Sequence, residues 1–412
     1  MSDQMADREV EQAFSQWIDQ AAPSSPPTRI LESTFVRTMG TRQLRVYPWN
    51  RFALGRGEAT FSGSGAGFGI AVLTLLIVVA MAAGFVGGAL RPTGTPSPSP
   101  SPTAAPSLPA AISVPVGATI AIADPLAMAS DGELLWVRAS GGRFYRIDPD
   151  TTAVAASATI DPATDVYVGL AINTDGLWTT YGDNATVYRL DPQTLAVDAT
   201  IVAGLAPRGV LANADGIWVA DVHGGKVLRI DPATNEVAAT IKTGLDVSGG
   251  PSWLAQGLDS VWVDSPRNRT IDRVDPFTDI VQATIQAPAE FTPCGGIAVA
   301  ADSAWVTSCW VGTAVARIDA NSNEVVATID IHGHGHNPTT INDSVWVSVD
   351  GGTADSGKLV RIDAATNTID RVLVPSIEFG GGGDIVVAGG SVWVVDGYHD
   401  AVIGLPLSAF AP

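Results

Sequence analysis

The chain has 412 residues, of which 46% are hydrophobic, and it carries a formal net charge of −19. Residues 1–64 are neutral overall, whereas the part beyond Arg91 has 15 basic and 35 acidic side chains and a net charge of −20. A surface this acidic repels phosphate backbones, so we expect no nucleic-acid partner.

Residues 1–64 are predicted to form a short helical segment. Apolar side chains recur with helical spacing over 10–18 and again over 31–39. Two helices of this length are too small for an independent hydrophobic core. The segment resembles the cytosolic headpieces of bacterial single-pass regulators such as anti-sigma-type proteins, which implies a cytosolic partner. The alternative is a membrane-proximal anchor without a partner.

A membrane span is predicted over residues 65–90. No charged side chain occurs between Glu58 and Arg91, and the apolar run is long enough to cross about 30 Å of hydrocarbon as a helix. Four arginines shortly precede the span, and Arg91 alone follows it directly. Excess arginine stays in the cytoplasm, so we expect a single-pass protein of the cell membrane with a cytoplasmic N-terminus and an extracytoplasmic C-terminal part.

Residues 91–109 are predicted to be a linker. Proline and serine alternate over much of this stretch. Such a sequence cannot build a core and favours an extended, fairly stiff chain. We therefore expect a spacer that holds the part beyond it, residues 110–412, away from the membrane.

Residues 110–412 contain a tryptophan strand repeated seven times, at steps of 42, 40, 44, 43, 41 and 47 residues. A period near forty that is built on strands is typical of a β-propeller, in which each repeat is one four-stranded antiparallel blade. The sequence therefore predicts an all-β, seven-bladed β-propeller. The tryptophans are Trp136, Trp178, Trp218, Trp262, Trp305, Trp346 and Trp393.

Six of the repeats also contain an Arg-x-Asp element, often followed by proline. A pair that occurs six times cannot be a single active site. We expect each aspartate to begin a turn and to accept backbone N–H bonds, and each tryptophan to pack between neighbouring blades.

The seventh repeat lacks a final strand, because the chain ends soon after its third. The segment 111–120 has the pattern of an outermost strand followed by the first strand of the next blade. We expect this N-terminal segment to complete blade seven, close the ring and cover an open sheet edge.

The repeats, with motifs such as RIDPATNEVAATIKTG at 229–244, resemble the bacterial YVTN-type propellers and the related virginiamycin B lyase-like family over residues 111–410. For the lyases, the resemblance implies a catalytic histidine and glutamate with magnesium on one rim. The Glu-x-His arrangement expected of those lyases does not occur in this sequence, and His334 and His336 match only its general location.

All five histidines are expected on one face of the ring. In a propeller, the loops from strand two to strand three and the loops between blades share a face. His223 and His399 fall in loops of the first kind, and His332, His334 and His336 fall in a loop of the second kind. The predicted ligand-binding rim on this face consists of His223, His399, Glu290, Arg208 and Tyr398.

The sequence His332-Gly-His-Gly-His336 could hold a metal ion. Spacing of two in an extended segment directs side chains the same way, so two imidazoles could reach one divalent cation, such as Mg²⁺, Mn²⁺ or Zn²⁺. His334, His336 and Glu378 are the candidate catalytic residues of such a site. The alternative is an exposed polar loop without a ligand.

Cys294 and Cys309 are the two cysteines of the chain, too few for a disulfide scaffold. They flank a hairpin centred near Ala301 and Asp302, and counting outward from this turn places them opposite each other. A disulfide is reasonable there outside the membrane. Two buried thiols are the alternative.

Two functions remain open on the sequence. The first is a membrane-anchored binding or sensing module for an extracytoplasmic protein, peptide or glycan. The second is a metal-dependent lyase or hydrolase that uses the histidine rim.

Overall fold

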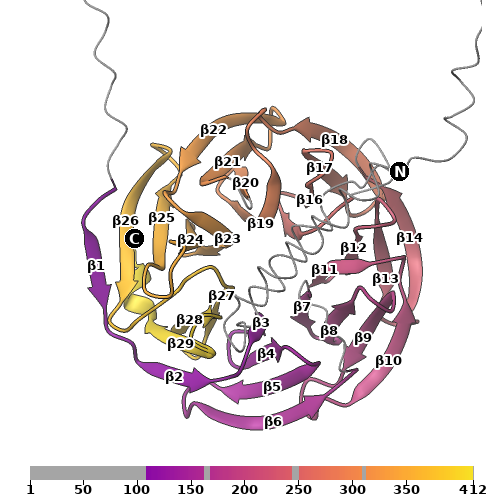
Figure 1. Cartoon of the computed structure of the whole chain (residues 1–412). Helices are drawn as coiled ribbons and strands as arrows, with labels where there is room; N and C mark the ends of the chain where they lie inside the picture. Colours follow the sequence, from indigo (N-terminus) through magenta and orange to yellow (C-terminus); the bar gives the residue numbers. More distant parts are fainter. Residues whose placement is uncertain (1–107, 162–167, 244–249, 309–311, 412) are drawn as a thin grey trace, which may run out of the picture. The chain divides into compact units, whose positions relative to one another are not determined.

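The computed structural model of the protein describes residues 108–161, 168–243, 250–308 and 312–411. Seven sheets of this part stand around a common axis, with one innermost strand from each sheet facing it (Figure 1). The innermost strands of successive sheets contact each other around the whole ring, including the last with the first. The predicted seven-bladed β-propeller is confirmed.

Each blade is built on four antiparallel strands in the same order, and blade six has one strand more. The strands of blades one to three are β3 (Pro125–Ser130), β4 (Leu135–Ala139), β5 (Arg143–Asp148) and β6 (Ala153–Thr159), then β7 (Leu170–Asn173), β8 (Gly176–Tyr181), β9 (Thr186–Leu190) and β10 (Val197–Val202), then β11 (Pro207–Asn213), β12 (Gly216–Asp221), β13 (Lys226–Asp231) and β14 (Glu236–Lys242). Those of blades four and five are β15 (Leu254–Gly257), β16 (Ser260–Ser265), β17 (Thr270–Asp275) and β18 (Ile280–Gln286), then β19 (Pro293–Ala300), β20 (Ser303–Ser308), β21 (Ala314–Asp319) and β22 (Glu324–Asp330).

Blades six and seven take strands from both ends of the propeller. Their strands are β23 (His334–Ile341), β24 (Ser344–Asp350), β25 (Lys358–Asp363) and β26 (Thr368–Pro375), with β1 (Ala111–Val114) as a fifth strand, and then β27 (Ile385–Ala388), β28 (Ser391–Asp396), β29 (Ala401–Pro406) and β2 (Ala118–Ala121). A short 3₁₀ helix, η2 (Leu407–Phe410), follows β29.

The seven repeated tryptophans are all buried, each with at most 1% of its surface exposed. Each lies on the second strand of its blade and packs against the next blade. Trp262 of blade four, for example, shares a core cluster with Val306 and Ile318 of blade five, and Trp393 of blade seven contacts Leu135 and Val137 of blade one. The tryptophans therefore build the core between the blades, as predicted.

The repeated aspartates start the turns between the third and fourth strands, as predicted. Asp319 accepts the backbone N–H groups of Asn321 and Ser322, at 3.0 and 2.7 Å. Asn323 completes this turn at φ +56°, a left-handed conformation that asparagine tolerates better than most residues. The Asp-x-x-x-Asn pattern of several repeats thus favours this turn through contacts within five residues.

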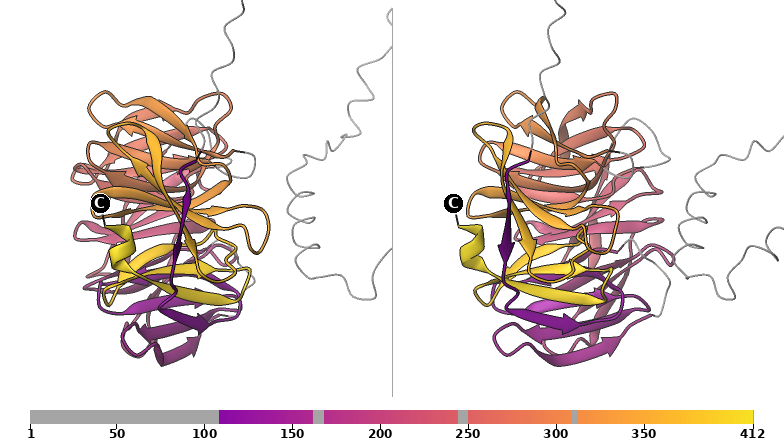
Figure 2. Two further views of the ribbon diagram at one scale, coloured as in Figure 1. Left: turned by 90° about the vertical axis from the view of Figure 1, so that its left-hand side faces the viewer. Right: turned by 60° about the vertical axis from the view of Figure 1, so that its left-hand side comes forward.

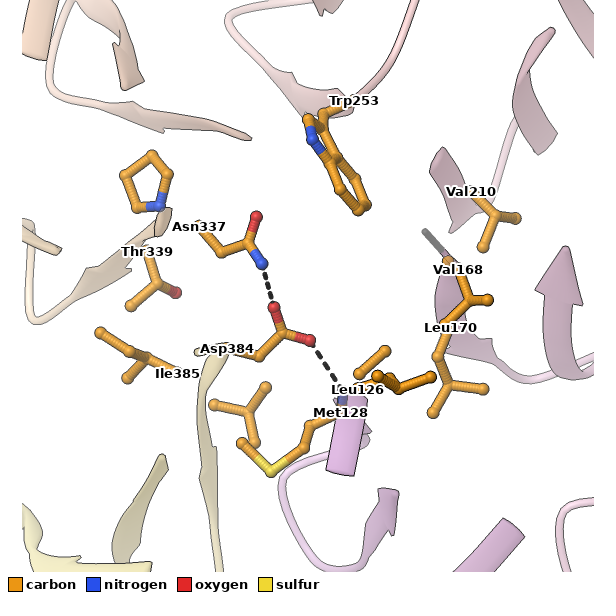
Figure 3. Close-up of a pocket in the computed structure, with 14 residues that line it drawn as sticks. Leu126, Met128, Val168, Leu170, Val210, Trp253, Asn337, Thr339, Asp384 and Ile385 are labelled. Carbon is orange, nitrogen blue, oxygen red and sulfur yellow. Dashed lines mark hydrogen bonds between the residues drawn. The ribbon is translucent and has the colours of Figure 1, made fainter. Parts of the chain in front are cut away.

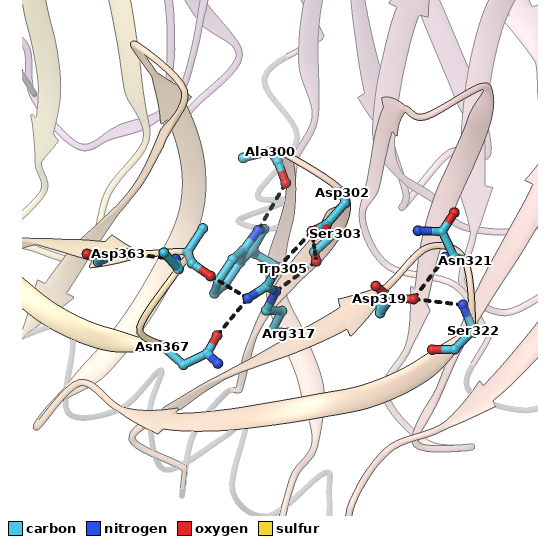
Figure 4. Close-up of polar contacts among 12 residues, drawn as sticks. Ala300, Asp302, Ser303, Trp305, Arg317, Asp319, Asn321, Ser322, Asp363 and Asn367 are labelled. Carbon is cyan, nitrogen blue, oxygen red and sulfur yellow. Dashed lines mark hydrogen bonds and ion pairs between the residues drawn. The ribbon is translucent and has the colours of Figure 1, made fainter.

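The repeated arginines join each blade to the next one. Arg317 of blade five lies across Trp305, with its guanidinium carbon 5.2 Å from the ring centroid, and donates hydrogen bonds to the Ala364 carbonyl and to Asn367 of blade six (Figure 4). Equivalent bonds run from Arg189 to Pro232 and Asn235, and from Arg273 to Ala320 and Asn323. We call this contact the blade latch. Blade seven lacks it, because Gly404 stands opposite Trp393 where the other blades have arginine.

Closure of the ring differs in one respect from the sequence prediction. Residues 118–121 form β2, which pairs antiparallel with β29 and completes blade seven. However, β1 pairs parallel with β26 as an extra strand of blade six, and the first strand of blade one starts only at Pro125. Figure 2 shows β1 along the edge of blade six, leading into β2. The strand breaks at Pro115, which has no N–H group for a sheet ladder.

The predictions for residues 1–64, for the span 65–90 and for most of the linker 91–109 lie outside the described residues. Within the described part, the structure contains no helix of the length and apolar character that a membrane crossing requires.

Candidate functional site

One face of the propeller is built by two sets of connections: those from the second to the third strand of each blade, and those from the outermost strand to the next blade. We call it the histidine face. His223 and His399 lie in connections of the first set, in blades three and seven. His332 precedes β23, and His334 and His336 lie at the start of that strand, where the chain enters from this face. The topology thus places the histidines where the sequence predicted them.

His399 belongs to a cluster of polar residues at the corner between blades six and seven. Its Nδ1 atom lies 2.8 Å from Oδ2 of Asp396, and its Nε2 atom lies 3.8 Å from Oε2 of Glu378. The Asp396 side chain is buried, whereas that of Glu378 is 81% exposed. The buried carboxylate therefore fixes the ring and leaves Nε2 directed toward the surface.

Tyr398 extends this cluster toward blade six. Its hydroxyl group donates a hydrogen bond of 3.0 Å to Oδ2 of Asp350 at the end of β24. A side chain at Gly380 would collide with the Tyr398 ring, because a Cβ atom there would lie 2.2 Å from it. The glycine run after Glu378 therefore lets the backbone pass under the ring, while buried Phe379 anchors the loop in the core.

The three histidines before and within β23 do not act as a unit. His332 has φ +53°, and its Nδ1 atom lies 3.6 Å from Oδ2 of Asp330. His334 and His336 stand opposite Asp350 and Ser348 in the ladder with β24. Burial lowers the pKa of His336, and the nearby Asp350 charge partly offsets this effect. A neutral His336 could accept or donate a hydrogen bond at neutral pH.

No group of three or more His, Cys, Asp or Glu side chains in residues 108–161, 168–243, 250–308 and 312–411 could hold a metal ion. The metal role of His332, His334 and His336 therefore stays a prediction from the sequence. No cluster of metal ligands among these residues supports that role.

The other predicted rim residues lie in other sectors of the ring. His223 and Glu290 are exposed in the connections β12–β13 and β18–β19. Arg208 lies in β11 with its guanidinium carbon 5.4 Å from the Trp253 ring centroid. Burial raises the pKa of Asp264, and the charge of Arg208 lowers it by a smaller amount. Arg208 thus takes part in packing between blades three and four.

A cavity of about 210 Å³ lies on the axis, where the innermost strands begin (Figure 3). Six of the seven blades contribute to its wall, which combines apolar side chains with polar groups. Leu126 and Met128 come from blade one, Leu170 from blade two, Val210 from blade three and Ile385 from blade seven. Because innermost strands start on the histidine face, the cavity belongs to the same side of the ring as the His399 cluster.

Asp384, Asn337 and Thr339 supply side-chain polar groups to the wall of this cavity, and the Trp253 ring is also part of the wall (Figure 3). The Met128 N–H group donates to Oδ2 of Asp384 at 2.8 Å, and the Asn337 amide donates to Oδ1. Burial raises the pKa of Asp384 to about 6, and these two hydrogen bonds limit the rise. Sequence reasoning missed Asp384 and Asn337. The available signal was an acidic residue directly after the glycine run 380–383, at the start of an innermost strand.

The sequence matches no protein-family model and no curated protein. Among solved structures, BamB from Moraxella catarrhalis is 15% identical with a TM-score of 0.49, over 68% of this chain and 83% of that one. A chain of Kuenenia stuttgartiensis hydrazine synthase is 13% identical with a TM-score of 0.56, over 70% of this chain and 97% of that one. At this identity the second likeness supports the fold alone. Membership of the YVTN-type or virginiamycin B lyase-like family stays a prediction.

Proposed function

We propose that the protein is a membrane-anchored binding module whose propeller presents the histidine face to an extracytoplasmic protein or peptide. The observation that carries this proposal is the juxtaposition, on one face, of an axial cavity and the polar cluster around His399. Concave sites that combine apolar side chains with a few fixed polar groups are the usual form of a binding site. Membrane attachment rests on the sequence pattern of residues 65–90.

Charge favours a basic ligand at the corner of this face between blades six and seven. The connections of blades six and seven carry Asp350, Asp355, Glu378 and Asp400, and Lys358 is the one lysine or arginine among residues 331–333, 350–358, 376–384 and 396–400. An acidic surface speeds the approach of a basic partner and excludes acidic ones. A protein or peptide segment with lysine or arginine side chains fits this surface better than a neutral glycan.

The test is a selection of peptides from a random displayed library on the detergent-solubilised full chain. We expect enriched sequences to be basic, and to bind at least tenfold more weakly after Tyr398→Ala combined with Glu378→Gln. Phe277→Ala is the matched control, because Phe277 is 78% exposed in the β17–β18 turn on the opposite face. The proposal fails if no peptide is enriched, or if the Phe277 variant is the one that loses binding.

The hydrogen-bonded pair of Asp396 and His399 favours a second candidate, a lyase or hydrolase. A histidine whose Nδ1 atom is held by a carboxylate can take up a proton at Nε2 as a general base. Mass spectrometry of the selected peptides separates the two candidates. Intact peptides support binding, whereas chemical change that disappears with His399→Gln supports catalysis.

The anchor is tested separately by fractionation. The full chain should sediment with membranes and resist carbonate extraction, whereas a chain lacking residues 1–90 should not. External protease should digest the propeller in cells without disrupting the cytoplasmic membrane if the proposed orientation holds. Equal solubility of the two chains would remove the anchor from the proposal.

A further inference from the structure

The axial cavity contains a carboxylate without a counter-ion among the described residues. Asp384 accepts two hydrogen bonds, one at each oxygen, from Met128 and Asn337. The ion pairs that the structure shows in its described part do not include it. Each carboxylate oxygen can accept two hydrogen bonds, so capacity for a further donor remains.

The surroundings make this charge costly when it is alone. Apolar side chains such as Leu170, Val210 and Ile385 line the cavity together with polar groups, and no lysine or arginine is among the lining residues. A carboxylate in an apolar environment is unfavourable unless it is paired, and a cationic partner offsets that cost. With a pKa of about 6, Asp384 is mostly ionised at neutral pH, although its side chain is partly buried.

The volume and lining of the cavity limit the kinds of ligand that it can hold. Its volume of about 210 Å³ exceeds the roughly 150 Å³ of an engineered protein cavity that holds benzene. An alkyl chain of a few carbons fits this space and matches its walls. A metal ion is a poorer candidate, because no group of three or more His, Cys, Asp or Glu side chains among the described residues could hold one.

We propose that the axial cavity binds a primary ammonium or guanidinium group on an alkyl chain, with Asp384 as the anion that pairs with it and Asn337 as the residue that positions the carboxylate. The inference rests on the proposed binding function and deepens it. A lysine or arginine side chain of a bound peptide, or a free alkylamine, would present this chemistry.

A purely structural role for Asp384 is the competing explanation. Its two hydrogen bonds join blade seven to blades six and one, at partners 47 and 256 residues away. Asp384→Asn separates the two explanations, because it keeps the shape of the side chain. The new amide oxygen can still accept from Met128, and Asn337 can turn its own amide to accept from the new NH₂ group. The variant should therefore fold while losing the charge.

The experiment measures calorimetric binding of n-butylammonium and n-butylguanidinium to the full chain at 0.15 M salt, where the Debye length is about 8 Å. We expect Asp384→Asn to weaken both at least tenfold, and n-butanol to bind the natural chain at least tenfold more weakly than n-butylammonium. Glu324→Gln is the control, an exposed acidic residue at the start of β22 on the opposite face, and should change binding less than twofold. An acetylated Gly-Gly-Lys-Gly-Gly peptide and its norleucine analogue distinguish a peptide side chain from a free amine.

The inference is overturned if the alcohol binds as well as the amine, if Glu324→Gln weakens binding as much as Asp384→Asn, or if neither cation binds. The comparison of amine with alcohol uses the natural chain, so it decides the matter even if the variant does not fold. Enriched peptides whose binding does not depend on Asp384 would support the binding function and contradict this pocket. Amine binding without any enriched peptide would support this pocket and contradict the proposed binding function.

Discussion

Arg317 of blade five donates a hydrogen bond of 2.9 Å from Nη1 to Oδ1 of Asn367 in blade six. The same nitrogen donates to the Ala364 carbonyl, and Nε donates to Ser303 in its own blade. One partly buried cation thus holds two sheets together while its guanidinium group covers a tryptophan. The blade latch explains why arginine recurs beside the turn aspartate.

Arg317→Ala is expected to lower the free energy of unfolding by about 2 kcal/mol, because hydrogen bonds to charged groups contribute about 1.5–3 kcal/mol. Urea denaturation followed by tryptophan fluorescence measures the change. Lys242→Ala removes an exposed charge of the same sign from β14 and should cost less than about 0.5 kcal/mol. Equal midpoints for the two variants would show that the latch contributes nothing to stability.

The two N-terminal strands give a matched pair of variants for ring closure. Ile120 in β2 is 7% exposed and packs into the core between blades seven and one, whereas Ile112 in β1 is 51% exposed. Ile120→Asp should destabilise the propeller by about 3 kcal/mol or more, because it buries a charge and removes apolar contacts. Ile112→Asp should cost less than about 1 kcal/mol. Limited proteolysis should cut the first variant sooner, and similar digestion of both would contradict β2 as the closing strand.

Buried Asp264 should make stability fall as pH rises. Burial raises the pKa of its carboxyl group from 3.8 to about 7, although it accepts the Trp253 N–H at 2.7 Å. The folded chain therefore keeps this proton between about pH 4 and 7 while the unfolded chain releases it. Across that window the contribution lost is at most about 4 kcal/mol, at 1.36 kcal/mol per pKa unit.

Asp264→Asn should flatten this part of the pH profile of the unfolding free energy, measured by urea titrations at several pH values. The slope is the readout, because the substitution also changes the local hydrogen bonds. Asp355→Asn should leave the slope as it is, since that side chain is exposed. An unchanged slope in the Asp264 variant would refute the assignment.

The pairing of Cys294 with Cys309 stays a prediction, because Cys309 lies outside the described residues. Its neighbour Ser308 pairs with Pro293, the neighbour of Cys294, across a register shift in the β19–β20 ladder. We expect the purified protein to be two hydrogens lighter than the reduced chain. Reduction should lower the free energy of unfolding by about 3 kcal/mol, the value for a loop of about 15 residues. Alkylation of both cysteines in unfolded, unreduced protein would show that no bond exists.

Much of the propeller could be predicted, because the residues that determine its strands and turns act on nearby residues of the chain. Trp305 on its strand, Asp319 at the start of a turn and Asn323 with positive φ each act within a few residues of the chain. The face that carries the histidines followed from the same repeat, since strand order decides where a loop emerges. The cavity did not follow, because Asn337 and Asp384 lie in different blades and neither belongs to a repeated motif.

The sequence by itself determined the number of blades and the turn at each Asp-Pro element. Each repeat of about forty residues contains the hydrophobic alternation of its strands and the residues that favour its turns. Only the tertiary structure decided that β1 joins blade six, that each arginine reaches the next blade, and that Asp384 meets Met128 across 256 residues. These contacts depend on the curvature with which seven sheets close into a ring. That curvature results from packing all the blades together, so it cannot be predicted from any single segment.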